Sequence, residues 1–289
     1  MRASSTIKSE TLQVPGANLY YEVRGSGPVL LMMPGGPADA TTFRRIEDGL
    51  ASRYTVVTYD PRGLSHSHLY EQLDDARMVE IFADDAHRLL VKTSRSKAFV
   101  FASSGGAVIA LELARRHPDQ LDTVICHEPP SPDLQPNPEQ VRAAMEDVCD
   151  TYASAGLWPA MEKFMTLVGI QGGGPPPARE CEPSPETMES MALTQKNMEF
   201  FFGRYIRNIA RYRPDFTALQ ACSCRIVPAT GAESRGQLAH DGGLGLARDW
   251  ERRPPSFLAI TAASTAARPS SRRSSAKCST AEYRTDSHA

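Results

Sequence analysis

The chain has little that would direct it to a membrane, a nucleic acid or a metal ion. No apolar run among its 289 residues approaches the about 18 needed to span a bilayer. The first ten residues, MRASSTIKSE, lack the apolar core of a signal peptide. A formal net charge of −2 gives no general attraction to nucleic acid or to anionic lipid. These absences predict a soluble, cytoplasmic protein with neither nucleic acid nor membrane as a partner.

Cysteine is present, but not in a metal-binding pattern. The six cysteines stand at positions 126, 149, 181, 222, 224 and 278. Only one residue separates Cys222 from Cys224, whereas a zinc knuckle has two between its cysteines, and no second pair follows. We interpret all six as free thiols of a reducing compartment and expect no metal and no organic cofactor.

The first half of the chain alternates short apolar runs with amphipathic stretches. The near-continuous apolar character of the runs is typical of buried strands in a parallel sheet, and their order with the helical stretches predicts βαβ units and an α/β fold. Residues 11–27 alternate with period two around a Pro-Gly turn, which predicts an antiparallel hairpin at the sheet edge. The predicted strands are 29–33, 54–60, 97–102, 121–128 and 224–231, and the predicted helices are 42–53, 78–92 and 107–118.

Between residues 129 and 219 the pattern is helical only. A loop rich in Gly and Pro, residues 169–185, interrupts the helical stretches. We expect this insertion to cover the carboxyl edge of the sheet, where ligands bind in open α/β sheets. Its apolar side chains either line a pocket or form the insertion's own core; they are Met198, Phe200, Phe201, Phe202 and Tyr205.

The segment VFASSGGAVIALELARRHP joins a predicted strand to a predicted helix through two serines. A serine at such a joint, with small residues two positions before and after it, is typical of a nucleophile elbow. Ser104 has Ala102 and Gly106 at those positions, whereas Ser103 would have the bulky Phe101 before it. Ser104 is therefore the candidate nucleophile, and the alternative is a serine that only caps the helix.

The segment MMPGGPADA follows the first apolar strand and provides a second element of the same site. Its consecutive glycines allow the backbone to approach the elbow closely. The backbone N–H groups of Gly36 and Gly105 would then form an oxyanion hole. The alternative is a tight turn with a structural role alone.

With these motifs, residues 10–250 resemble the α/β-hydrolase fold family. The resemblance rests on PGGP, YDPRG (59–63), the SSGG elbow and RRHPDQL. It is closest to the lidded branch of esterases, proline iminopeptidases and haloperoxidase-like enzymes. It implies a mostly parallel sheet with helices on both faces, divided into core (1–128), lid (129–219) and core (220–250). The composition of residues 251–289 predicts a disordered tail. Ala102 stands where the family usually has the first glycine of the elbow, and Pro34 where it usually has histidine.

The resemblance also implies a catalytic carboxylate and a histidine. Glu233, after the strand at 224–231, is the first candidate for the acid, and Glu128, at the end of the strand after the elbow helix, is the alternative. The histidine should follow the last strand, about 20–30 residues beyond Glu233. The seven histidines stand at 66, 68, 87, 117, 127, 240 and 288, and none has that position.

The expected position of the histidine falls in a segment of unusual composition, rich in Ser, Ala, Arg and Pro. Back-translated with mostly G or C in third positions, residues 255–281 permit a shifted reading of VVPGDHGGFDSRPPEFAAKLREVLDG and a stop. That reading has a strand, a histidine loop and a helix in the family's order. We therefore hypothesise a frameshift near Arg248; the alternative is a genuinely divergent tail.

The sequence thus predicts a serine hydrolase of small apolar esters or amides, impaired by a missing histidine. The alternative is a non-catalytic relative or a small-molecule-binding protein on the same fold. Losing the last strand and helix also predicts reduced stability, because one edge and part of one face of the sheet would be uncovered.

Overall fold

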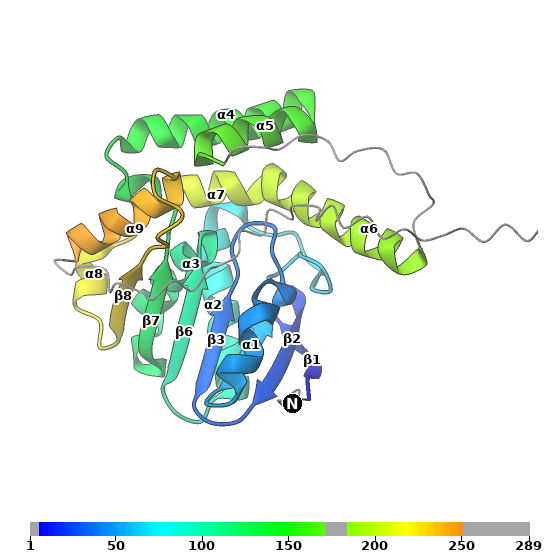
Figure 1. Ribbon diagram of the computed structural model, residues 1–289, viewed down its shortest axis with the longest axis vertical. Helices are drawn as coiled ribbons and strands as arrows, with labels where there is room; N and C mark the ends of the chain where they lie inside the picture. Colours follow the sequence, from blue (N-terminus) through cyan, green and yellow to red (C-terminus); the bar gives the residue numbers. More distant parts are fainter. Residues whose placement is uncertain (1–5, 171–183, 251–289) are drawn as a thin grey trace, which may run out of the picture.

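The computed structural model describes residues 6–170 and 184–250, which form one twisted sheet with helices on both faces (Figure 1). The strand order is β1-β2-β4-β3-β6-β7-β8, and β5 pairs with β2. Neighbours from β4 to β8 are parallel, whereas β2 is antiparallel to β1, β4 and β5. The expected α/β-hydrolase fold with a mostly parallel sheet is confirmed.

The strands fall where apolar runs predict them. The β1–β2 pair is the expected hairpin at the sheet edge. Every residue of β3 is buried, as expected for a strand covered on both faces. The strands are β1 (Lys8–Val14), β2 (Ala17–Gly25), β3 (Val29–Met33), β4 (Thr55–Tyr59), β5 (His68–Leu69), β6 (Ala98–Ser103), β7 (Leu121–His127) and β8 (Arg225–Ala229).

The helices divide between the sheet faces and an insertion between β7 and β8. Those of the sheet are α1 (Arg44–Ala51), α2 (Met78–Thr93), α3 (Gly105–Arg116), α8 (Phe216–Gln220) and α9 (Leu238–Asp249). Those of the insertion are α4 (Pro138–Ala155), α5 (Leu157–Val168), α6 (Pro185–Phe200) and α7 (Ile206–Arg211), with a π-helical turn, η5 (Phe201–Tyr205), between the last two. Short 3₁₀ turns are η1 (Ala40–Phe43), η2 (Asp75–Arg77), η3 (Pro118–Gln120) and η4 (Pro132–Leu134).

The two faces of the sheet are packed unequally. Helices α2 and α3 share the main hydrophobic core with one face, whereas a smaller core joins α1 to the other. On β6 and β7, side chains directed to the main core are fully buried; they are Val100, Ala102, Val124 and Cys126. Their neighbours on the α1 side are half-buried; they are Phe99, Phe101, Thr123, Ile125 and His127.

This half-buried region is the one that the predicted loss of a covering helix would leave exposed. Strand β8 ends the strand order of the described chain. Residues 251–289, which the sequence predicts to be a disordered tail, lie outside the described residues. The described part of the chain therefore leaves the α1 side of β6 and β7 incompletely covered.

Helices α4 to α7 lie over the carboxyl ends of the parallel strands (Figure 1). The insertion is tied to the sheet layer through its apolar residues, because Phe201, Phe202 and Tyr205 belong to the main core.

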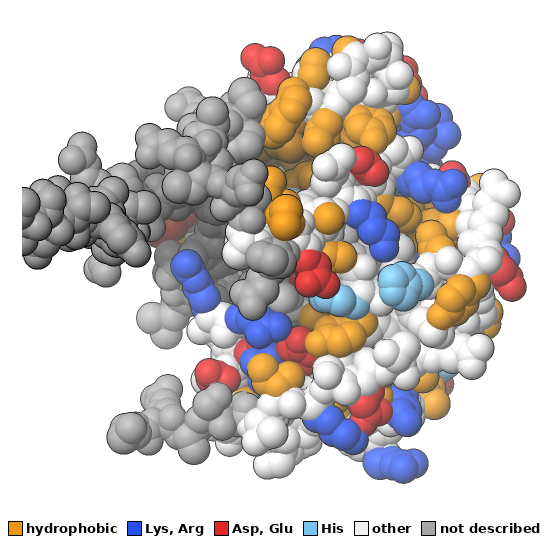
Figure 2. Space-filling model, turned by 90° about the vertical axis from the view of Figure 1, so that its right-hand side faces the viewer, with side chains coloured by type: hydrophobic (Ala, Val, Ile, Leu, Met, Phe, Trp, Pro, Cys, Tyr) orange, Lys and Arg blue, Asp and Glu red, His pale blue; other side chains and the backbone are white. Residues whose placement is uncertain are grey.

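None of the helices in the described ranges is long and apolar enough to span a bilayer. The face that carries β1 and β2 mixes acidic and basic side chains without a large patch of either sign (Figure 2).

Candidate active site

Ser104 lies on a sharp turn between strand β6 and helix α3. Its backbone has φ 55° and ψ −131°, a conformation that non-glycine residues rarely adopt. The Ser104 N–H donates to the carbonyl oxygen of His127 at 2.9 Å, and the Ser104 carbonyl accepts from Ala107 N–H at 2.8 Å. The side chain makes no capping hydrogen bond to α3. The turn thus has the strained geometry typical of a nucleophile elbow, and its hydroxyl is not used as a helix cap.

Small residues are required where the elbow meets the loop after β3. A Cβ atom on Gly106 would collide with the carbonyl oxygens of Pro34 and Met33. A Cβ atom on Gly35 would lie 2.7 Å from Gly105 N and 2.9 Å from Ser104 Cβ. The glycines therefore permit a direct backbone contact between the loop and the elbow.

Gly36 and Gly105 lie on the two sides of this contact. Gly36 has φ +62°, which glycine adopts without strain, and Gly105 is the first residue of α3. The first N–H groups of a helix have no partner within it and attract negative charge. The loop that carries Gly36 thus lies against the start of α3, where the sequence predicts an oxyanion hole.

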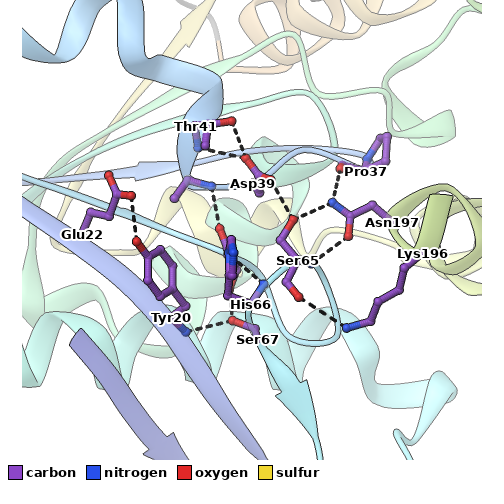
Figure 3. A network of polar contacts seen from close by, with 12 residues as sticks. Tyr20, Glu22, Pro37, Asp39, Thr41, Ser65, His66, Ser67, Lys196 and Asn197 are labelled. Atoms are coloured by element: carbon purple, nitrogen blue, oxygen red, sulfur yellow. Dashed lines mark hydrogen bonds and ion pairs between the residues drawn. The ribbon is translucent and has the colours of Figure 1, made fainter. Parts of the chain in front are cut away.

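A polar network fixes the loop that carries Gly36 (Figure 3). Buried Asp60, which follows β4, accepts from Ala40 N–H and from His66 N–H, both at 2.9 Å. Burial raises the pKa of Asp60, and these two hydrogen bonds oppose the rise. Asp39 accepts from the Ser65 hydroxyl at 2.7 Å. The loops after β3 and β4 are therefore held together by two carboxylates.

Asn197 of helix α6 joins the insertion to the same network (Figure 3). Its Oδ1 accepts from Ser65 N–H at 2.7 Å, and its Nδ2 donates to Ser65 Oγ at 2.8 Å and to the Pro37 carbonyl oxygen at 3.1 Å. The side chain is buried, and Ser65 has a positive φ of 42°. Sequence reasoning missed Asn197, because nothing in the local pattern of α6 distinguishes it from an exposed polar residue.

Of the two candidate acids, Glu128 is the one that is buried and held by hydrogen bonds. It directly follows β7 with φ 54°, and only 9% of the residue is exposed. Its Oε1 accepts from Gly231 N–H at 2.8 Å and also from the Ser234 hydroxyl. Because β6 and β7 are parallel neighbours and Ser103 pairs with His127, Glu128 lies beside the elbow.

Glu233 has no comparable environment. It lies in the turn after β8 and is exposed. The hydrogen bonds of that turn go to Glu128, through Gly231 and Ser234, which flank Glu233 in the sequence. The carboxylate held by this turn is therefore that of Glu128.

His127 is a residue of this region that sequence reasoning did not single out. Its Nδ1 lies 3.1 Å from Ser103 Oγ, and burial lowers its pKa while the Glu128 carboxylate opposes that change. The register of β6 and β7 would have suggested the contact, had the two strands been known to be neighbours. Within the described ranges, His127 is thus the histidine that bonds to a serine of the elbow. Its partner is Ser103 and not the candidate nucleophile, Ser104.

Other histidines are engaged elsewhere. His66 lies 2.9 Å from Asp60 Oδ2, and His117 lies 3.0 Å from Asp84 Oδ1 and stacks on His87. His240 is buried in α9. In residues 6–170 and 184–250, no group of three or more His, Cys, Asp or Glu side chains could hold a metal ion.

The aromatic side chains of the insertion form part of its core and also touch the site loops. Phe201 and Phe202 pack edge to face against Phe164. The Phe201 ring would lie 3.4 Å from a Cβ atom on Gly36, and the Tyr205 hydroxyl 2.5 Å from one on Gly105. Phe201, Phe202 and Tyr205 thus belong to the core, and Phe201 and Tyr205 also contact the glycines of the site loops; the lining of a pocket stays a prediction.

Comparison with known proteins identifies similar chains. Residues 28–164 match the sequence profile of the alpha/beta hydrolase fold. An uncharacterized hydrolase of Bacillus subtilis (strain 168), YraK, is 39% identical over 239 residues, which are 80% of each chain. A zearalenone hydrolase of Cladophialophora bantiana is 28% identical over 146 residues, 48% of this chain and 52% of that protein.

Solved structures show the same fold at low identity. A carboxylesterase of Nitrososphaera gargenis superposes with a TM-score of 0.61 at 15% identity, covering 85% of this chain and 88% of the other. A thermophilic esterase of Thermogutta terrifontis gives 0.54 at 19% identity, covering 86% of each. At such identities the likeness concerns the arrangement of helices and strands alone.

Proposed function

Because the chain belongs to the α/β-hydrolase family, we propose that it is a serine hydrolase of small apolar esters or amides, with Ser104 as its nucleophile. The observation that carries the proposal is the strained backbone of Ser104 at the end of β6, with a hydroxyl that does not cap α3. Strain of this kind is retained where the surrounding fold enforces it, commonly at active sites.

The proposed step is acyl transfer. Ser104 Oγ forms a bond to the carbonyl carbon, and the π electron pair of the carbonyl moves onto its oxygen. The N–H groups of Gly36 and Gly105 donate to that oxygen, an arrangement in which a single donor contributes about 10²–10³-fold in rate. The carbonyl then re-forms as the bond to the alcohol or amine breaks, and the leaving group takes a proton from solvent. Water next adds to the acyl carbon and loses a proton to solvent. The bond to Ser104 Oγ then breaks, which releases the acid, and the serine takes back a proton.

We assign the carboxylate of the site to Glu128. Its burial and its acceptance of hydrogen bonds from Gly231 N–H and the Ser234 hydroxyl support a fixed side chain beside the elbow. In the family's mechanism such a carboxylate orients a histidine and stabilises its protonated form. Glu233, which the sequence placed first, is exposed and lacks this support.

The proton of Ser104 has no imidazole to receive it within the described residues. His127 is bonded to Ser103, and the expected histidine would fall in residues 251–289, where the sequence has only His288. We propose that the serine proton passes to solvent or buffer, so acylation is slow. A serine without a neighbouring base is a weak nucleophile.

The insertion serves in this proposal as a lid that admits apolar substrates. Its position over the carboxyl ends of the strands and the approach of Phe201 to Gly36 support that role. A zearalenone hydrolase among the relatives agrees with a substrate of low polarity, and the named esterases of the same fold agree with an ester.

A second candidate is a non-catalytic binding protein. The observation in its favour is the lack, in the described ranges, of a hydrogen bond from any histidine to Ser104. The two candidates share the same site and differ in the reactivity of Ser104.

Hydrolysis of p-nitrophenyl esters of increasing acyl length tests the proposal. We expect slow turnover that favours short apolar acyl groups and disappears in Ser104→Ala. Turnover of the Ser104→Ala variant at the rate of the unaltered chain would contradict the assignment. No turnover by either protein would favour the binding candidate.

A further inference from the structure

A buried tyrosine hydroxyl of the insertion lies against the candidate oxyanion hole. Tyr205 is 3% exposed, and its hydroxyl oxygen would be 2.5 Å from a Cβ atom on Gly105. Gly36 N–H faces the same oxygen and lowers the pKa of Tyr205, although burial raises it by more. The hydroxyl thus lies beside both residues of the candidate oxyanion hole.

The Tyr205 O–H has no acceptor among the described residues. A buried donor without a partner is costly, and a phenylalanine would fill the same core position without that cost. By contrast, the hydroxyl of buried Tyr21 donates to Glu10 at 2.6 Å, and that of half-buried Tyr212 donates to Glu112 at 2.6 Å. The unmet donor of Tyr205 is therefore available to an acceptor from outside residues 6–170 and 184–250.

The backbone of the insertion is irregular where it carries this residue. Tyr205 ends the π-helical turn η5, and such turns occur frequently at functional sites. Its ring is held by Phe82 and Phe201, with centroids 6.3 and 5.9 Å away. Four and eight residues earlier, Phe201 and Asn197 contact Gly36 and Pro37 of the same loop. One side of the segment 197–205 thus faces the loop and the elbow.

We propose that Tyr205 is a third oxyanion donor: its hydroxyl donates a hydrogen bond to the substrate carbonyl oxygen beside the N–H groups of Gly36 and Gly105. This inference rests on the proposed acyl transfer. The phenol remains protonated at neutral pH because burial raises its pKa. As negative charge develops on the substrate oxygen, the hydrogen bond strengthens, so the hydroxyl acts mainly on the transition state.

Phosphonylation of Ser104 by a fluorophosphonate probe tests this role, since the phosphoryl oxygen occupies the place of the oxyanion. The Oγ–P bond forms, the P–F bond breaks, fluoride leaves and the serine proton passes to solvent. We expect Tyr205→Phe to lower the labelling rate by about 10- to 100-fold, with equal or greater resistance to urea. Tyr212→Phe is the matched control: it loses its bond to Glu112 and should be less stable, but should label at the unaltered rate.

Equilibrium binding of N-butylbutanamide gives a second measurement that needs neither a base nor a covalent bond. Its carbonyl accepts the Tyr205 hydrogen bond, so Tyr205→Phe should bind it several-fold more weakly, and Tyr212→Phe should not. If Ser104 never labels but the amide binding depends on Tyr205, the donor role stands and the proposed catalysis fails. Equal or faster labelling and equal amide binding in Tyr205→Phe would overturn the inference, as would an unaltered chain that neither labels nor binds the amide.

Discussion

Asn197 of helix α6 donates a hydrogen bond to the carbonyl oxygen of Pro37, at 3.1 Å, and thereby joins the insertion to the loop that carries Gly36. The same side chain exchanges two further hydrogen bonds with Ser65. The buried side-chain amide of Asn197 therefore links the position of the insertion to the position of the candidate oxyanion hole.

Replacing Asn197 should lower the stability of the fold. Asn197→Ala leaves the Ser65 N–H and the Pro37 carbonyl without their partner, and we expect a loss of about 2–3 kcal/mol in the free energy of unfolding. Gln195→Ala, on the exposed side of the same helix, should change it by less than about 0.5 kcal/mol. Urea unfolding measures both, and equal effects would contradict the linkage.

The two candidate carboxylates can be separated by chemical rescue. Added imidazole should accelerate the labelling of Ser104 by supplying the base, and Glu128 should stabilise the imidazolium that forms. Glu128→Gln should therefore abolish most of the acceleration, whereas Glu233→Gln should leave it intact. The reverse pattern would assign the acid to Glu233.

His127 should make stability depend on pH. Its pKa is lowered in the folded chain, so below about pH 6.5 the unfolded chain binds more protons than the folded one, and stability falls as the pH falls. His127→Asn removes this contribution, and its free energy of unfolding should decline less between about pH 7.5 and about pH 5.5. His117, whose pKa is also lowered, is present in both proteins. An unchanged decline would show that His127 is protonated alike in both states.

Two isoleucines on paired strands test how well each side of the sheet is covered. Ile226 of β8 is fully buried, whereas Ile125 of β7 is half-buried on the α1 side. Ile226→Ala should cost about 2–5 kcal/mol and Ile125→Ala less than about 1 kcal/mol. If Ile125→Ala costs as much as Ile226→Ala, residues 251–289 cover that side after all, and the predicted loss of a covering helix is wrong.

Much of the fold follows from local pattern, and parts of the site do not. The bounds of β3 and the small residues around Ser104 are readable because each depends on neighbours within a few positions. The contact of Asn197 with Ser65 joins residues 132 positions apart and cannot be inferred without the packing of α6. Tyr205 was named among the apolar residues of the insertion, but its direction depends on the π-helical turn, which helical periodicity does not anticipate. The frameshift near Arg248 stays a prediction that the coding DNA can test.

The central claim is that Ser104 is the nucleophile of a hydrolase whose base is missing. The most direct measurement is the rate of fluorophosphonate labelling with and without imidazole, with the labelled serine located by tandem mass spectrometry. We predict slow labelling confined to Ser104, clearly accelerated by imidazole and absent in Ser104→Ala. Labelling of Ser103 instead, or an intact chain that stays unlabelled even with imidazole, would contradict the account.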